Sequence, residues 1–144
     1  MSRGKSNLGA TENAEKQQSI VDTIVAEATP QGRAGVSVVR VSGPNARSIA
    51  EALSGKVGEP RIASVRPVVD SENALIDEAL VLFFKAPQSF TGDDIVEFQT
   101  HGGPIVVKRT IAACRAQGAR MARPGEFSER AFLNGKMDLV QLEA

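Results

Sequence analysis

Alternating side chains predict a β-strand over residues 94–104, DIVEFQTHGGP, which then runs into a Gly-Gly-Pro turn. The face expected to meet the core holds Val96, Phe98 and Thr100. The other face holds Ile95, Glu97, Gln99 and His101. Glycines let the backbone approach a ligand closely, and the proline can open a helix. Two interpretations stay open: a small-molecule pocket beside the turn, or the solvated face of a half-exposed strand.

Two further strands are predicted over residues 22–28 and 35–41, joined by a turn-rich loop over residues 29–34. In the second strand Arg40 shares a face with Val36 and Val38. A cation in such a strand is costly to bury unless an anion or several acceptors meet it. Arg40 therefore either lies at an edge with its head in water or reaches into a pocket.

Helical spacing of apolar residues appears in three places. The first helix follows Ser42-Gly43-Pro44 and ends at Gly55, with Ala46, Ile49, Ala50 and Leu53 on one face. The second covers residues 104–117, with Val107, Ile111 and Cys114 on one stripe, and the third covers residues 126–133. We predict additional extended segments over residues 61–69, 79–85 (apolar and buried) and 119–123. The order of elements favours an α+β fold, a mixed sheet with flanking helices, over a doubly wound parallel sheet.

The two ends differ from this pattern. Residues 1–19 are polar, with Leu8 as the one large apolar residue, and have no apolar centre typical of a secretory signal. We expect a disordered tail there and a folded domain over residues 20–134. Asp138 and Gln141 resemble a capping box before an apolar stretch, so residues 135–144 are expected to begin a further helical segment that continues in a larger protein.

Composition narrows the classes of protein. The 144 residues are 42% hydrophobic, enough for a single domain that folds without metal or disulfide. One cysteine, Cys114, fits a reducing cytosol, and we expect it in the core. No apolar run reaches the length of a membrane span. One histidine and one cysteine make a metal site improbable on composition.

The formal net charge is zero, but the charges are unevenly distributed. Residues 70–97 hold seven acids and one lysine, whereas residues 103–136 hold seven bases and two glutamates. This asymmetry fits intramolecular pairing, a self-complementary dimer, a basic face for an anionic partner, or simply solvated surface.

Two familiar site motifs are missing. The chain has no G-x-x-x-x-G-K-[ST] phosphate loop and no G-x-G-x-x-G. His101-Gly102-Gly103 is similar to the oxyanion turn of esterases, but these enzymes also need a G-x-S-x-G elbow, which the sequence lacks.

Six collinear blocks carry a family resemblance. They are residues 22–26 (DTIVA), 28–33 (ATPQGR), 39–44 (VRVSGP), 89–94 (SFTGDD), 99–104 (QTHGGP) and 122–139 (ARPGEFSERAFLNGKMDL). Together they resemble the N-terminal domain of the MnmE (TrmE) tRNA-modification GTPases. The resemblance runs from about residue 22 to the last residue, 144.

The resemblance implies a domain similar to the folate-binding part of the glycine-cleavage T protein. It implies homodimerisation through this domain and binding of 5-formyltetrahydrofolate or another tetrahydrofolate. Family members work in the cytoplasm with the flavoprotein MnmG to modify carbon 5 of the wobble uridine of tRNA. GTP, Mg²⁺ and K⁺ are bound by a GTPase domain that lies outside this sequence, so no GTP hydrolysis by the family route is expected of the fragment.

The family's folate-contacting Arg, Glu and Lys fall on Arg40, Glu97 and Lys136, and no catalytic or metal-binding residue is assigned. A carboxylate can accept the adjacent N–H and amino groups of a pterin, so Glu97 is expected on the pterin. The two cations are expected on carbonyl or carboxylate groups. Two alternatives remain: a stand-alone folate-dependent one-carbon transferase, and a dimerisation scaffold without ligand.

Overall fold

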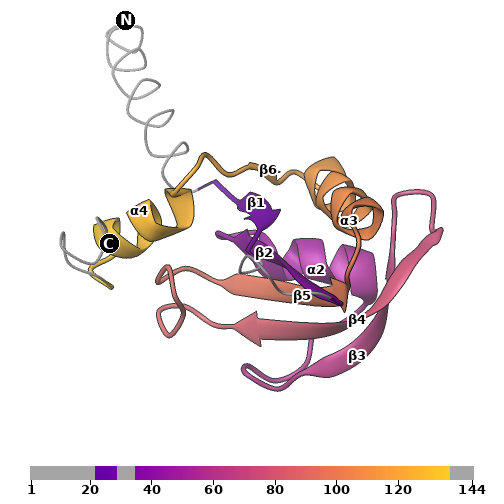
Figure 1. Cartoon of the computed structure of the whole chain (residues 1–144). Helices are drawn as coiled ribbons and strands as arrows, with labels where there is room; N and C mark the ends of the chain where they lie inside the picture. The colour runs from indigo at the N-terminus through magenta and orange to yellow at the C-terminus, as the bar shows by residue number, and fades with distance from the viewer. Residues whose placement is uncertain (1–21, 29–34, 137–144) are drawn as a thin grey trace, which may run out of the picture.

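The computed structural model describes residues 22–28 and 35–136 (Figure 1). Its strands are β1 (Ile24–Glu27), β2 (Val36–Ser42), β3 (Ser64–Val69), β4 (Leu75–Phe84), β5 (Ile95–His101) and β6 (Arg120–Met121). Its helices are α2 (Ala46–Ser54), α3 (Pro104–Ala116) and α4 (Glu126–Leu133). The elements predicted from the sequence are present, and the fold is α+β as expected.

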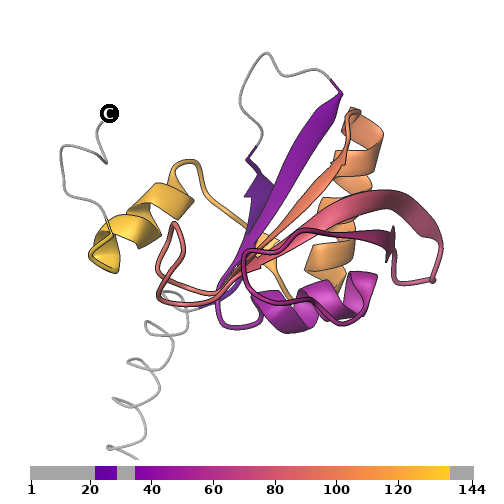
Figure 2. The same ribbon diagram turned by 90° about the horizontal axis from the view of Figure 1, so that it is seen from below.

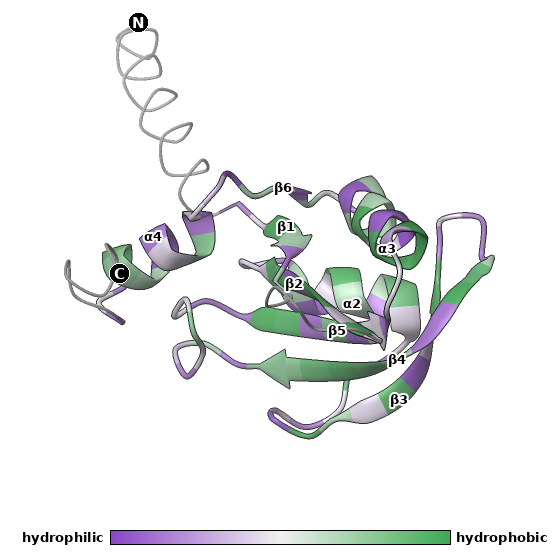
Figure 3. Cartoon of the chain, in the orientation of Figure 1, coloured by the Kyte–Doolittle hydropathy of each residue, from purple (hydrophilic) through white to green (hydrophobic). Residues whose placement is uncertain are grey.

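One six-stranded sheet organises these elements, in the order β3-β4-β5-β2-β1-β6. All neighbouring strands run antiparallel except β1 and β6, which pair in parallel. The sheet is therefore mixed. Figure 3 shows hydrophobic residues concentrated in the strands and hydrophilic residues in many of the connections.

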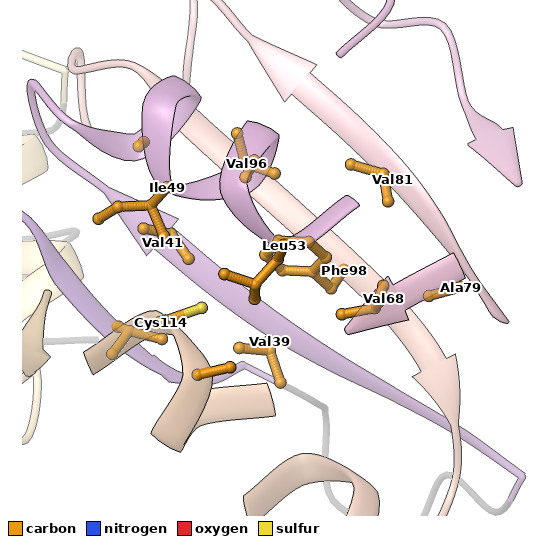
Figure 4. Close-up of a cluster of buried hydrophobic side chains, with 14 of the residues drawn as sticks. Val39, Val41, Ile49, Leu53, Val68, Ala79, Val81, Val96, Phe98 and Cys114 are labelled. Atoms are coloured by element: carbon orange, nitrogen blue, oxygen red, sulfur yellow. The ribbon is translucent and has the colours of Figure 1, made fainter. Parts of the chain in front are cut away.

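The core lies between the sheet and two helices. Ile49 and Leu53 of α2 and Cys114 of α3 pack on Val41 and Phe98 of the sheet (Figure 4). The predicted apolar face of α2 is buried throughout, because its four members are at most 3% exposed. Cys114 is fully buried, and burial raises the pKa of its thiol to about 12. It is a core residue, as predicted.

The strand predicted over residues 79–85 begins earlier and is less buried than expected. Asp70 Oδ1 accepts hydrogen bonds from the backbone N–H groups of Glu72 and Ala74, both at 2.9 Å. This turn lets β4 start at Leu75 and pair with β3. Only one face of β4 is covered by the helices, and Leu80 on the other face is 38% exposed. The interpretation as a buried strand was wrong for that face.

Gly102 has a structural role that differs from the predicted one. Its N–H donates to the Gly35 carbonyl oxygen at 2.8 Å. A Cβ on Gly102 would lie 3.0 Å from the Gly35 backbone. Gly102 thus allows a close backbone approach to Gly35, the residue before β2. Gly103, at φ 134°, then leads into Pro104 at the start of α3, as predicted.

Three sequence-based expectations concern other parts of the chain. The tail over residues 1–19, the loop over residues 29–34 and the helix start at residues 138–144 lie outside the described residues. Within the described residues, no helix is long and apolar enough to cross a membrane.

Candidate functional site

Arg40 and Glu97 face each other across two adjacent strands. The register of β2 and β5 places them directly opposite, on the sheet face away from α2 and α3. Arg40 Nε donates to Glu97 Oε2 at 3.0 Å, and Nη2 lies 2.9 Å from the same oxygen. Their side chains are 22% and 15% exposed. Glu97 is therefore the anion that the cation in the valine-rich strand requires.

Two aromatic rings enclose the Arg40 guanidinium. Its Cζ lies 5.3 Å from the ring centre of Phe90 and 5.4 Å from that of Phe127. Phe90 belongs to the β4–β5 connection, and Phe127 lies in the first turn of α4. Both contacts have the geometry of a cation–π interaction. The guanidinium is thus held by two rings as well as by Glu97.

The turn that carries Phe90 is built from short polar side chains. Ser42 Oγ and Thr91 Oγ1 lie 2.8 Å apart in a buried contact that joins the turn to β2. Ser89 Oγ donates to the Asp93 carbonyl oxygen and accepts from the Gly92 N–H. Because these bonds fix the backbone on both sides of Phe90, the ring position is determined by the fold.

Lys136 lies beside the same turn. Asn134 Nδ2 donates to the Thr91 carbonyl oxygen at 2.7 Å. A Cβ on Gly92, whose φ is 86°, would lie 2.9 Å from Asn134 Cβ and 3.3 Å from Lys136 Cγ. The end of α4 thus packs directly on the Phe90 turn, and Lys136 is exposed there. The structure thus places Lys136 beside the turn that carries Phe90, and among the described residues Lys136 makes no ion pair.

A buried ionic cluster anchors α4, which lies at the end of the molecule away from α3 (Figures 1 and 2). Glu126 is 2% exposed. Its Oε2 lies 2.6 Å from Arg120 Nη2, and its Oε1 accepts a hydrogen bond from the backbone N–H of Arg123 at 2.8 Å. Arg130, also buried, donates to Asp22 Oδ1 at 2.7 Å. Burial raises the pKa of Glu126, but its bonds from Arg120 and Arg123 outweigh burial and hold the pKa at about 2.

His101 belongs to a separate group. Its ring Nδ1 lies 2.8 Å from Asp77 Oδ1, and its backbone N–H donates to Asp77 Oδ2 at 2.8 Å. Glu97, in contrast, pairs with Arg40. The three polar groups of β5 share one face as predicted, but they do not converge on a single point.

The uneven charges are partly paired within the chain. Arg109 pairs with Asp70 at 3.1 Å, and Arg130 lies 3.9 Å from Asp93. Within residues 22–28 and 35–136, three bases of the basic stretch make no ion pair: Lys108, Arg115 and Lys136. Intramolecular pairing therefore accounts for part of the asymmetry.

Residues 23–136 match the family model described as "GTP-binding protein TrmE N-terminus". The chain belongs to this family. The match confirms the resemblance inferred from the six sequence blocks, and it includes Arg40, Glu97 and Lys136.

Several curated relatives of the TrmE N-terminal family match most of this chain. "tRNA modification GTPase MnmE" of Legionella pneumophila (strain Corby) is 56% identical over 125 residues, 86% of this chain and 28% of that protein. The protein of the same name from Alkalilimnicola ehrlichii is 57% identical over 122 residues, 85% of this chain and 28% of its own length. That from Chromohalobacter salexigens is 54% identical over 123 residues. The chain thus spans little more than a quarter of the relatives it matches.

Sequence reasoning missed two parts of this candidate site. Phe90 and Phe127 were not singled out, although both lie in blocks that carry the resemblance. The available signal was their rarity, because the chain has six phenylalanines and no tyrosine or tryptophan. The ionic cluster was also missed. Glu126 and Arg130, four residues apart on the face of α4 that also buries Ala131, were its signal.

Proposed function

We propose that this chain is the tetrahydrofolate-binding and homodimerisation module of a GTPase that modifies carbon 5 of the wobble uridine of tRNA. The observation that carries the proposal is the Arg40–Glu97 pair, presented on an open sheet face and enclosed by two aromatic rings. GTP, Mg²⁺ and K⁺ binding, the flavoprotein MnmG and tRNA belong to the longer protein in this proposal, which we place in the cytoplasm.

The free side of Glu97 fits the pterin edge. Both bonds from Arg40 end on Oε2, so within the described part of the chain Oε1 accepts no hydrogen bond. Among the described residues Oε1 is not a buried atom without a partner, so it is accessible to solvent. A pterin presents an N–H and an amino group side by side, and a carboxylate accepts such a pair with charge-assisted bonds.

The cations support the remainder of the ligand. Glu97 and the two rings hold the Arg40 guanidinium in one position. From there it can donate hydrogen bonds to carbonyl groups near the pterin. Lys136 is exposed beside the Phe90 turn, and its long side chain can reach an anionic group in solution. We assign these two residues to carbonyl or carboxylate groups of the folate.

Calorimetric titration with 5-formyltetrahydrofolate tests the proposed ligand. We expect saturable binding, and we expect p-aminobenzoylglutamate, which lacks the pterin edge, to bind much more weakly. A folded chain that binds neither compound would be a dimerisation scaffold without ligand. Turnover of a one-carbon donor by this chain alone would instead support a stand-alone transferase.

Ultracentrifugation tests the proposed dimer. Contacts across a two-fold axis can use the bases Lys108 and Arg115 and the acids Glu72 and Glu78, because none of them makes an ion pair within the described residues. At micromolar concentration we expect a mass near twice 15.2 kDa, with dissociation favoured by high salt because exposed charge pairs are screened. A mass of 15.2 kDa at the highest accessible concentration would contradict the dimer.

A further inference from the structure

The chain holds one asparagine that is followed by a glycine, Asn134, where α4 ends. Asparagine is chemically labile, and a following glycine leaves its own backbone nitrogen unhindered because it has no side chain. That nitrogen can attack the asparagine side chain. The four other asparagines precede leucine or alanine, whose side chains hinder the same attack. Asn134 and Gly135 are both exposed, so water reaches them.

The reaction open to this pair is deamidation, and it consumes only water. The Gly135 backbone nitrogen forms a bond to Asn134 Cγ, while the bond between Cγ and the side-chain nitrogen breaks. Ammonia leaves with the proton of the attacking nitrogen, and a cyclic imide remains. Water then opens the imide at either of its carbonyl carbons, which gives aspartate or isoaspartate. In isoaspartate the main chain runs through the side-chain carbonyl and is longer by one methylene group.

The fold keeps both reacting groups engaged elsewhere. Asn134 Nδ2 donates to the Thr91 carbonyl oxygen at 2.7 Å and to Asp93 Oδ1 at 3.3 Å. The Gly135 N–H donates to the Phe132 carbonyl oxygen at 3.0 Å. The side chain is thus bonded to the β4–β5 connection, and the attacking nitrogen is bonded to α4. Ring closure therefore requires that the end of α4 first opens away from this connection.

We propose that Asn134-Gly135 is a modification site: the contact between α4 and the β4–β5 connection protects it from deamidation, and deamidation in turn breaks this contact. Aspartate keeps the size of asparagine but loses both donated bonds. It also places a negative charge beside the Thr91 carbonyl oxygen and the Asp93 carboxylate. The site therefore records each opening of α4 that leads to reaction in a product that does not revert.

Trypsin digestion measures the reaction directly. Cleavage after Arg130 and Lys136 releases residues 131–136 (AFLNGK), and mass spectrometry with chromatography separates the amide, aspartate and isoaspartate forms. In the folded full chain at neutral pH, we expect deamidation at least about tenfold slower than in a synthetic peptide of residues 131–136, because the chain reacts only while α4 is open. The same rate in the chain and in the peptide would overturn the proposed protection.

Gly92→Ala and Gly118→Ala form a matched pair that tests the contact. Both glycines have a positive φ, 86° and 108°, so alanine is strained at either position. A Cβ on Gly92 would lie 2.9 Å from Asn134 Cβ, whereas a Cβ on Gly118 would meet nothing within 4 Å. Gly92→Ala should therefore raise the deamidation rate toward that of the peptide, and Gly118→Ala should leave it close to wild type. Equal rates in the two variants, each shown by its melting curve to be folded, would contradict the role of the contact.

Asn134→Asp tests whether the product breaks the contact. The Gly92 N–H donates to Ser89 Oγ at 3.0 Å in the β4–β5 connection, and we expect its hydrogen exchange to be at least about tenfold faster in this variant. The Gly118 N–H donates to the Arg115 carbonyl oxygen at 3.0 Å and should exchange as in wild type. Unchanged exchange at Gly92, or equal acceleration at Gly92 and Gly118, would overturn this half of the proposal.

Discussion

Replacing Arg130 with methionine should lower the free energy of unfolding by about 3–5 kcal/mol, because a broken buried ion pair leaves its partners uncompensated. The Arg130 side chain is 4% exposed and pairs with Asp22 and Glu126. Methionine keeps the apolar stem but removes the buried cation, which leaves Asp22 with Arg120 and Glu126 with Arg120 and the exposed Arg123. Denaturant unfolding measures the loss.

Arg123→Met is the matched control. Arg123 borders the same cluster, but its side chain is 63% exposed. Exposed pairs contribute about 0–1 kcal/mol, so this variant should unfold close to the wild-type midpoint. An equal loss of unfolding free energy in both variants would contradict the prediction, because it would show that burial of an arginine does not determine its contribution to stability.

Replacing Arg120, the other arginine of the cluster, with methionine should have an effect that depends on pH. The pKa of Glu126 lies at about 2 in the folded chain, below its ordinary value of 4.5. A lowered pKa gives stability that is present above 4.5 and is lost as the pH falls toward 2. Arg120 lowers this pKa most strongly, so the difference between wild type and Arg120→Met should shrink over this interval. A constant difference would mean that the Glu126 charge is not involved.

Replacing Glu97 with alanine should weaken 5-formyltetrahydrofolate binding by roughly ten- to a hundredfold, since charge-assisted bonds contribute about 1.5–3 kcal/mol. Calorimetry measures the loss. Glu27→Ala removes an exposed carboxylate from β1 and is the control. If Glu97→Ala binds folate as tightly as wild type, the open face of β5 is only a solvated surface.

The same substitution has a second consequence that sequence alone did not indicate. A carboxylate that faces a ligand usually contributes little to stability, but Glu97 is the partner of the half-buried Arg40. Glu97→Ala leaves that cation between two rings without its anion, so some loss of stability accompanies the loss of binding. Affinities must therefore be measured below the melting transition of the variant.

Local patterns were enough for much of the fold. The period of two in a strand assigned Arg40 and Glu97 to faces, and the period near 3.6 found the buried side of α2. The pairing of Arg40 with Glu97 could not be read in this way. The two residues are 57 positions apart, and only the register of β2 on β5 makes them neighbours.

Contacts made by the connections and the helix ends are harder to predict from sequence than strand register. Phe90 lies in a turn whose shape depends on Ser42 and Asn134, residues from two distant segments. Asp22 reaches Arg130 across 108 positions. No local periodicity encodes which distant residues these side chains contact, so the partners in the ring enclosure and in the ionic cluster were found from the structure.

The parallel pairing of β1 with β6 has a consequence for the order of synthesis. β1 is synthesised early, but β6, its parallel partner, begins at Arg120. Arg120 lies 98 positions after Asp22, which closely precedes β1. Until that segment leaves the ribosome, β1 can pair only with β2, and its other edge stays open to foreign strands. The last-made part of the domain, from β6 through α4, therefore protects the first-made strand and completes the surroundings of Arg40 in the same step.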